Sequence, residues 1–274
     1  METDMTAEAT DQLPTDLFSV RGKVALVTGG SRGIGLMIAR GLVEAGARVY
    51  ISSRKARVCD EVAQELSALG ECVSLPADVG EEAGARGLAA ALREREEKLH
   101  ILVNNAGATW GAPLEDYPDS AFDKLWAVNV KGPFRLTTEL LPALRAAATP
   151  HDPARVVNIG SVDGYTVSRT ENYAYGPTKA AIHQMTRQLA ARLTDDNITV
   201  NAVAPGPFES KMMAYILDDP ESRKAVEQRV PLGRIGAPAD AAGATIFLCS
   251  RAGAYITGAV LPLDGGISSL GRRS

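Results

Sequence analysis

Short apolar runs alternate along the chain with segments whose apolar residues recur at helical spacing. An uninterrupted run of apolar side chains is typical of a strand buried on both faces, and a spacing of three to four residues is typical of a helix packed on one face. The apolar runs are residues 23–27, 48–52, 72–75, 99–103, 155–159, 199–203 and 259–263. The main helical segments are residues 36–45, 56–69, 81–98, 123–138, 173–193 and 238–249. Regular alternation predicts an α/β fold with one doubly wound sheet of about seven parallel strands.

The junction between the first strand and the first helix is rich in glycine. Residues 28–35 read Thr-Gly-Gly-Ser-Arg-Gly-Ile-Gly. Without Cβ atoms the backbone can turn sharply and approach a pyrophosphate, and the N–H groups at the helix start face its charge. A P-loop is disfavoured because no lysine follows the last glycine. The turn therefore predicts a Rossmann-like dinucleotide site, and a tight turn without a ligand is the alternative.

The end of the second predicted strand indicates which nicotinamide cofactor binds. A carboxylate at this place would bind the ribose of NAD, whereas an arginine suits the 2′-phosphate of NADP. Residues 52–55 read Ser-Ser-Arg-Lys and include no acid. Arg54, with Arg32 from the glycine turn, can offer paired donors to a phosphate. The sequence favours NADP(H), with a solvated basic loop as the alternative.

Polar residues also follow the third and fourth strands. Asp78 can meet an adenine amino group or cap the next helix, and both readings stay open. Residues 104–107 read Asn-Asn-Ala-Gly at the end of the fourth strand. Asn129 lies inside a helical segment, where an asparagine competes for backbone hydrogen bonds. We expect that Asn129 either bends this helix or is needed for function.

Ser161, Tyr175 and Lys179 together form a candidate acid–base site. Ser161 follows the fifth strand, and Tyr175 and Lys179 share one face of the next helix because they are four residues apart. A nearby ammonium favours the phenolate of a tyrosine, and a serine can hold a substrate carbonyl. With hydride from a nicotinamide, this set predicts carbonyl reduction, reversible to alcohol oxidation. Each residue taken singly has a structural role as its alternative.

The chain shows no linker or repeat that would divide it. We expect a mobile acidic leader over residues 1–16, which contain Asp and Glu but no Lys or Arg, and one domain over residues 17–274. Residues 207–236 form a long connection interrupted by prolines, with Met212, Met213, Tyr215, Ile216 and Leu217 as adaptable apolar surface. Such a connection predicts a substrate lid, and an ordinary surface excursion is the alternative.

Composition narrows the classes of function. The 274 residues are 45% hydrophobic and carry a net charge of -4, without the basic stripe of a nucleic-acid-binding protein. No apolar run approaches the roughly 18 residues of a membrane span. The three cysteines and three histidines have no metal-ligand spacing, so no metal is expected. Scattered cysteines indicate a reducing, cytoplasmic setting.

These motifs, in this order, resemble the short-chain dehydrogenase/reductase family over about residues 17–267. The resemblance implies catalytic roles for Asn129, Ser161, Tyr175 and Lys179. It implies that Asn129 helps to hold a proton-relay water, that Lys179 also binds the nicotinamide ribose, and that Ser210 contacts the carboxamide. A homotetramer is implied by the resemblance alone. The full set of expected cofactor-binding residues is Gly29, Ser31, Arg32, Gly33, Ile34, Gly35, Ser53, Arg54, Asp78, Val79, Asn105, Ala106, Gly107, Tyr175, Lys179, Pro205, Gly206, Phe208 and Ser210.

Within the family, residues 106–111, 154–161 and 174–177 look like the rhamnolipid-associated 3-oxoacyl reductases. This resemblance suggests NADPH-dependent reduction of a 3-oxoacyl thioester carried on acyl carrier protein or coenzyme A. Thr178 replaces the serine common before the catalytic lysine, a change that we expect to be harmless. The alternatives are a reductase of another ketone, sugar or steroid-like alcohol, and a nucleotide-sensing binding protein without catalysis. The acyl length, carrier, direction and pathway do not follow from the sequence.

Overall fold

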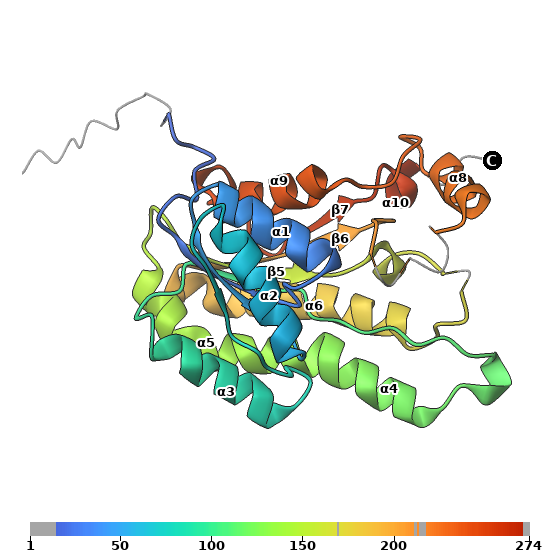
Figure 1. The fold of residues 1–274 in the computed structure, drawn as a ribbon, viewed down its shortest axis with the longest axis horizontal. Helices are drawn as coiled ribbons and strands as arrows, with labels where there is room; N and C mark the ends of the chain where they lie inside the picture. Colours follow the sequence, from blue (N-terminus) through green and yellow to red (C-terminus); the bar gives the residue numbers. More distant parts are fainter. Residues whose placement is uncertain (1–14, 169, 211–212, 214–217, 271–274) are drawn as a thin grey trace, which may run out of the picture.

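A seven-stranded parallel sheet forms the centre of the molecule (Figure 1). The computed structural model describes residues 15–168, 170–210, 213 and 218–270. The strand order is β3-β2-β1-β4-β5-β6-β7, and all neighbouring pairs are parallel. The strands are β1 (Val24–Thr28), β2 (Arg48–Ser52), β3 (Cys72–Ser74), β4 (Ile101–Asn104), β5 (Ala154–Ile159), β6 (Ile198–Pro205) and β7 (Val260–Leu263). The predicted doubly wound sheet is confirmed, and the order reverses between β1 and β4, where such folds bind ligands.

Helices cover both faces of the sheet. On one face lie α1 (Gly33–Glu44), α2 (Ala56–Ser67) and α9 (Pro238–Cys249), and on the other lie α3 (Glu82–Arg93), α5 (Gly132–Ala147) and α6 (Tyr175–Leu193). Shorter helices are α4 (Asp119–Trp126), α8 (Pro220–Arg229) and α10 (Ile267–Leu270). The predicted bounds of α9 and the predicted end of α6 are confirmed, and α6 begins two residues later than predicted. Helix α1 begins three residues earlier than predicted, because Gly33 and Gly35 are part of its first turn, and α3 ends five residues earlier.

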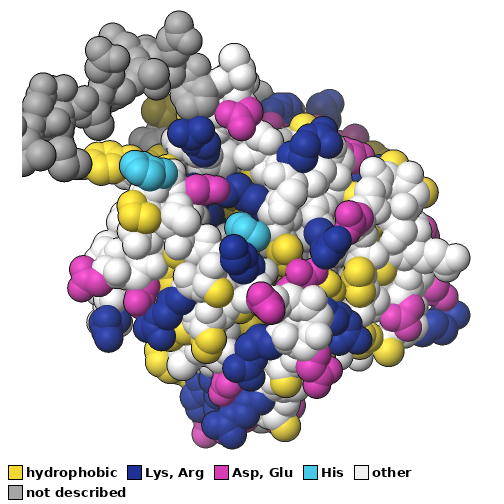
Figure 2. Space-filling model, turned by 90° about the vertical axis from the view of Figure 1, so that its left-hand side faces the viewer, with side chains coloured by type: hydrophobic (Ala, Val, Ile, Leu, Met, Phe, Trp, Pro, Cys, Tyr) yellow, Lys and Arg dark blue, Asp and Glu magenta, His cyan; other side chains and the backbone are white. Residues whose placement is uncertain are grey.

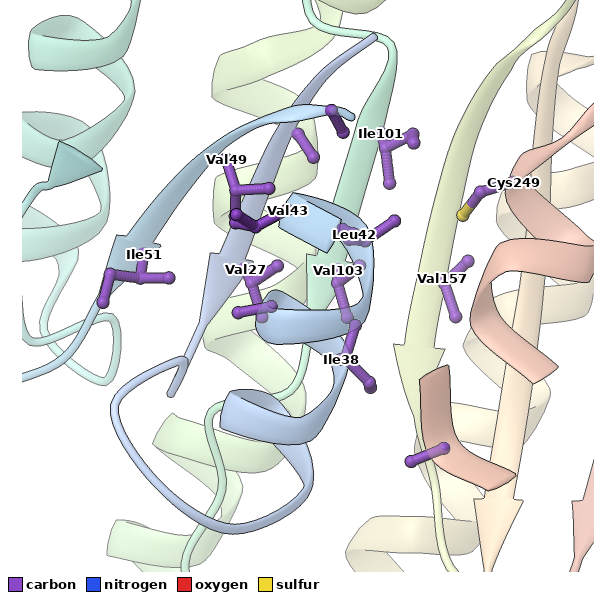
Figure 3. Packing of buried hydrophobic residues seen from close by; sticks show 14 of the residues in the cluster. Val27, Ile38, Leu42, Val43, Val49, Ile51, Ile101, Val103, Val157 and Cys249 are labelled. Atoms are coloured by element: carbon purple, nitrogen blue, oxygen red, sulfur yellow. The ribbon is translucent and has the colours of Figure 1, made fainter. Parts of the chain in front are cut away.

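Alternating residues of the strands divide the core into two layers. Val27 of β1, Val103 of β4 and Val157 of β5 point toward α1 and α9, where Ile38 and Cys249 meet them (Figure 3). The intervening strand residues, for example Leu26 and Leu102, pack on the opposite side against α3, α5 and α6. This two-residue alternation explains why the strands appear in the sequence as continuous apolar runs.

The helical segment around Asn129 is continuous but irregular. Helix α4 passes into a π-helix, η2 (Ala127–Lys131), which continues directly into α5. The Gly132 N–H donates to the carbonyl of Ala127, five residues back, so one residue is inserted into the helical ladder at Asn129. Helix α5 also runs through Pro142 and joins the segment predicted to end at residue 138 to residues 144–147, whose composition favours a helix as well.

Two further expectations fall partly on residues outside the described part of the chain. Of the expected leader, residues 1–14 are outside it; the domain is anchored from Leu17, whose carbonyl accepts the Ala252 N–H at 3.0 Å. Of the expected lid, Met212, Tyr215, Ile216 and Leu217 are outside it, and the described part contains α8. Among the described residues no helix is both long and apolar enough to cross a membrane. On the side of the molecule seen in Figure 2, Lys and Arg side chains are interspersed with Asp and Glu.

Candidate active site

The loops that follow β1, β2, β4, β5 and β6 meet at one edge of the sheet, as expected for parallel strands. The glycine turn after β1 lies against the end of β2, because the Gly30 N–H donates to the Ser52 carbonyl at 3.2 Å. Gly29 and Gly33 have φ angles of 65° and 53°, a region that favours glycine. A Cβ on Gly35 would lie 2.3 Å from both the Asn105 amide nitrogen and the Gly29 carbonyl oxygen. The turn therefore requires these glycines.

Thr28 and Asn105 join the glycine turn to the end of β4. The Thr28 hydroxyl donates to the Val103 carbonyl and accepts the N–H groups of Asn105 and Ala106, each at 3.0 Å. The Asn105 amide donates to the Thr28 carbonyl at 2.9 Å. Asn105 is thus a brace for the turn, which leaves the neighbouring backbone of residues 106–107 at the site. The sequence argument did not single out Thr28, although it opens the glycine motif.

Arg54 and Asp78 lie together at the ends of β2 and β3. Their closest side-chain atoms, Nη1 and Oδ2, are 3.9 Å apart, and both side chains are exposed. The other Asp78 oxygen accepts the Gly80 N–H at 3.0 Å. Helix α3 begins after Glu81, so the alternative that Asp78 caps this helix is wrong. The buried Ser53 hydroxyl has no hydrogen-bond partner among the described residues. This corner combines an exposed guanidinium with a hydroxyl that those residues leave unused.

Ser161, Tyr175 and Lys179 come together at the end of β5. Tyr175 opens α6, and its phenol lies near enough to the Ser161 hydroxyl for that hydroxyl to lower the pKa of Tyr175. The Lys179 ammonium lies 5.6 Å from the centre of the Tyr175 ring and donates to the Ile159 carbonyl at 2.7 Å. Lys179 is 5% exposed. The structure therefore brings together the three residues that the sequence predicts for acid–base chemistry.

Burial dominates the ionisation of this group. It raises the pKa of Tyr175 to about 12, and the neighbouring Ser161 hydroxyl offsets only part of this shift. Burial lowers the pKa of Lys179 to about 8. The sequence argument expected the ammonium to favour the phenolate, whereas the Tyr175 pKa in this structure moves the other way because of desolvation. At neutral pH the phenol keeps its proton and the lysine stays a cation.

The oxygen and both N–H groups of the Asn129 side chain form hydrogen bonds within the protein. Its oxygen accepts the Ala108 N–H at 2.9 Å, and its amide donates to the Ala108 carbonyl and to the Thr178 hydroxyl, each at 3.0 Å. A Cβ on Gly107 would lie 3.4 Å from the Asn129 oxygen and 3.8 Å from the Lys179 nitrogen. Asn129 is therefore close to Lys179, but its side chain serves as a brace. A role in holding water would fall to the backbone of η2.

The loop after β6 lies against the glycine turn. A Cβ on Gly33 would lie 3.2 Å from the Cβ of Ser210, so Ser210 lies against the glycine turn. Phe208 is 3% exposed and packs against Gly236, so only its backbone faces the site. A cavity of about 670 Å³ lies between α1 and this loop, with Met37, Arg40 and Arg223 in its lining.

His183, for which the sequence argument expected only a structural or surface role, is buried near the site. Its ring is 3% exposed, and neither ring nitrogen has a hydrogen-bond partner among the described residues. A Cβ on Gly160 or Gly164 would lie within 2.5 Å of this ring. Burial lowers the pKa of His183 to about 4, so the ring is neutral at physiological pH. Its place one turn after Lys179 on α6 was the signal in the sequence. His183 fills the space beneath the Ser161 loop.

Aromatic side chains form a wall at the start of α6, the helix that Tyr175 opens. The Tyr117 hydroxyl donates to the Trp110 carbonyl at 3.3 Å and accepts the Ala174 N–H at 3.2 Å. The Tyr117 ring packs edge-on against Tyr173. Trp110 and Tyr173 remain exposed. The loop after β4 and the start of α6 therefore present exposed apolar surface in one place. Within the described residues, no group of three His, Cys, Asp or Glu side chains is placed to hold a metal ion.

Comparisons with known proteins agree with this geometry. A family model described as Enoyl-(Acyl carrier protein) reductase matches residues 29–268. The rhamnolipids biosynthesis 3-oxoacyl-[acyl-carrier-protein] reductase of Pseudomonas aeruginosa is 52% identical over 91% of this chain and 97% of its own length. The galactitol 2-dehydrogenase of Cereibacter sphaeroides, which forms L-tagatose, is 37% identical over 91% of this chain and 96% of its own.

A solved structure shares the fold closely. The active-site complex of Pseudomonas aeruginosa RhlG with NADP superimposes with a TM-score of 0.90 at 51% identity. The match covers 93% of this chain and all of that chain. The similarity thus extends over the sheet, the glycine turn and the helix that carries Tyr175.

Proposed function

Because this chain belongs to the short-chain dehydrogenase/reductase family, we propose that it reduces a 3-oxoacyl thioester to a 3-hydroxyacyl thioester with NADPH. The observation that carries the proposal is the meeting of Ser161, Tyr175 and Lys179 beside the glycine turn. Three groups suited to hold a carbonyl and protonate it thus lie at the edge where a dinucleotide would bind.

The residues present fit an NADP molecule. The glycine turn offers a cradle that side chains would fill, and the N-terminus of α1 favours the charge of a pyrophosphate. Arg54, Arg32 and the unpartnered hydroxyl of Ser53 would hold the 2′-phosphate. Asp78 would meet the adenine, and Ser210 the carboxamide. The backbone of residues 105–107, 205–206 and 208 would line the remainder, together with Val79 and Lys179.

Each catalytic residue has a role in carbonyl reduction. When bound, NADPH supplies the hydride that adds to the carbonyl carbon. Ser161 donates a hydrogen bond to the carbonyl oxygen, and Tyr175 transfers its proton to that oxygen, which completes the alcohol. The raised pKa of Tyr175 keeps the phenol protonated at neutral pH. Lys179 holds a positive charge beside the phenol and stabilises it once the proton has left. The backbone near Asn129 would hold the water that returns a proton.

The substrate class rests on the acyl reductase among the relatives and on the aromatic wall. That relative is 52% identical and is named for a 3-oxoacyl group on acyl carrier protein. The exposed rings of Trp110 and Tyr173, near the start of α6, offer apolar surface to an acyl chain. The carrier would be acyl carrier protein or coenzyme A.

A second function in the same family is oxidation or reduction of a sugar alcohol or another ketone. The 37% identity to a galactitol 2-dehydrogenase favours it. A binding protein without catalysis is a more distant alternative, because the acid, the carbonyl-holding serine and the lysine are all in place. Turnover separates these candidates.

The experiment is an assay of NADPH oxidation with acetoacetyl-coenzyme A. Wild-type protein should reduce it, and Tyr175→Phe should lower kcat by about 10²–10⁴-fold because the proton donor is lost. NADPH affinity, followed by nucleotide fluorescence, should stay within about twofold in this variant, since the ring remains. Turnover of simple ketones or sugars without turnover of acyl thioesters would overturn the substrate class. Unchanged turnover in Tyr175→Phe would overturn the catalytic assignment.

We also propose that the enzyme works in the cytoplasm as a homo-oligomer, a tetramer by family resemblance. All three cysteines, Cys59, Cys72 and Cys249, are free and buried, which suits a reducing compartment.

Phe122, Trp126 and Phe134 are exposed at intervals of four or eight residues along α4 and α5. An exposed apolar row on one continuous helix favours contact with another copy.

A further inference from the structure

Thr178 lies at the junction of three segments of the proposed active site. It is fully buried in the first turn of α6. Its hydroxyl donates to the carbonyl of Tyr175 at 2.8 Å and accepts the amide of Asn129 at 3.0 Å. A hydroxyl has one proton to donate, so its bond to Tyr175 leaves only its lone pairs for Asn129. The directions of the two bonds are therefore mutually consistent.

The bond from Thr178 to the Tyr175 carbonyl is the last in a series of hydrogen bonds in which each group donates to the next. The Ala108 N–H donates to the Asn129 oxygen, the Asn129 amide donates to Thr178, and Thr178 donates to the Tyr175 carbonyl. The second N–H of the Asn129 amide is used by the Ala108 carbonyl. No donor of this side chain is left over. The loop after β4, the π-helix η2 and the first turn of α6 are thereby held together.

A hydroxyl bonded to a carbonyl in its own helix is common for threonine and is by itself only local structure. The second partner of Thr178 makes the difference, because Asn129 is on another element and sits in an irregular turn. Loss of the hydroxyl would leave one buried N–H of Asn129 without an acceptor, an arrangement that proteins avoid. The π-helix would then shift or rotate to find another partner.

We propose that Thr178 is a positioning residue for the reaction: its hydroxyl fixes the π-helix around Asn129 against Tyr175. Because it acts through these two residues, Thr178 needs no contact with substrate or cofactor. The inference deepens the proposed function and rests on it for its kinetic part. It also refines the expectation that threonine at this position is harmless. The hydroxyl, which serine shares, is the essential part, and the methyl group is not.

The chain contains a matched control in the same helix. Thr186 is also fully buried, donates its hydroxyl to the Ile182 carbonyl at 2.8 Å and accepts the amide of Asn158 at 2.9 Å. It lies eight residues further along α6, away from Tyr175. Replacing either threonine by valine removes the same chemical group from the same kind of site. Only Thr178 should affect the reaction.

The kinetic test compares Thr178→Val, Thr178→Ser and Thr186→Val with wild-type protein. Thr178→Val should lower kcat with acetoacetyl-coenzyme A by about tenfold or more, with the KM for NADPH within about twofold. Thr178→Ser should return kcat to within about twofold of wild type, since it keeps the hydroxyl. Thr186→Val should keep the wild-type kcat. This expectation holds even if both valine variants have a lower urea midpoint of unfolding than the wild-type protein. Equal kcat in the two valine variants, or failure of serine to restore kcat, would overturn the proposal.

A readout without turnover tests the same contact. Hydrogen exchange of the Ala108 amide should be faster in Thr178→Val than in Thr186→Val, because Asn129 has lost one of its anchors. If Thr178→Val does not fold, Thr178→Ala removes the hydroxyl with less bulk and is measured in its place. Wild-type exchange at Ala108 in the hydroxyl-free variant would refute the brace. If wild-type protein does not reduce acetoacetyl-coenzyme A, the proposed substrate is wrong, while the exchange comparison still decides the role of the hydroxyl.

Discussion

At the scale of single residues, Arg54 carries the proposed choice between the two nicotinamide cofactors. Its guanidinium is exposed at the end of β2, and its only ion pair among the described residues is the long contact to Asp78. An exposed pair of this kind adds little to stability. The side chain is thus available for a phosphate, as the sequence predicted from the absence of an acid at this place.

Arg54→Ala should raise the KM for NADPH about 10- to 100-fold and leave the KM for NADH within about twofold. The reason is that one or two charge-assisted hydrogen bonds to the 2′-phosphate are lost, and NADH has no such phosphate. Steady-state assays with both cofactors measure this difference. Arg57→Ala is the control, because Arg57 is exposed on the adjoining turn of α2 and pairs with Glu61. Equal effects of Arg54→Ala on both cofactors would contradict the assignment.

At the scale of elements, α1 and α9 pack closely enough to require glycine at their contact. A Cβ on Gly41 of α1 would lie 2.4 Å from the Cβ of Ala242 on α9. Small residues on both helices thus bring their backbones together. Helix α1 also carries the last glycines of the cofactor turn, so this contact fixes the position of the turn. The sequence shows Gly41 only as a poor helix former, and the partner helix is 200 residues away.

Gly41→Ala should lower the free energy of unfolding by about 1–3 kcal/mol, because the helices must move apart. Gly87→Ala is the matched control, since Gly87 is also inside a helix, α3, and a Cβ there would meet nothing within 4 Å. That variant should be more stable by about 0.5–1 kcal/mol through its higher helix propensity. Urea unfolding of both variants measures the two signs. A stabilising effect of Gly41→Ala would show that the close contact is absent.

At the scale of the whole molecule, the row formed by Phe122, Trp126 and Phe134 bears on assembly. These side chains are 43%, 41% and 49% exposed, which is unusual for large apolar residues that share one helical stretch. Their exposure in a single chain is accounted for if a second copy covers them.

Wild-type protein should sediment as an oligomer of the 28.9-kDa chain, and Trp126→Glu should shift it toward smaller species. A charge placed in an apolar interface loses its hydration without gaining a partner. Leu232→Glu is the control, because Leu232 is 70% exposed on a different segment and should leave the sedimentation coefficient unchanged. A wild-type monomer would overturn the proposed assembly, and an unchanged oligomer in Trp126→Glu would exclude this row as its interface.

The sequence by itself determined the sheet, the glycine turn and the three residues Ser161, Tyr175 and Lys179. These features depend on local periodicity, on glycine geometry and on spacing within one helix. Each of these can be recognised within a short segment of the sequence. It also indicated that Asn129 was unusual in its helix. It left open whether the residue bends the helix or serves the site.

Only the tertiary structure decided how these residues work together. Asn129 sits in a π-helix and is bonded to Ala108 and Thr178, which lie 21 and 49 residues away. The direction of the Tyr175 pKa shift also depends on burial by distant segments, which spacing along α6 cannot reveal. Contacts between elements and the removal of water from side chains both arise from the packing of the whole chain. They decide the hydrogen-bond partners and the pKa values of residues that the sequence had already identified.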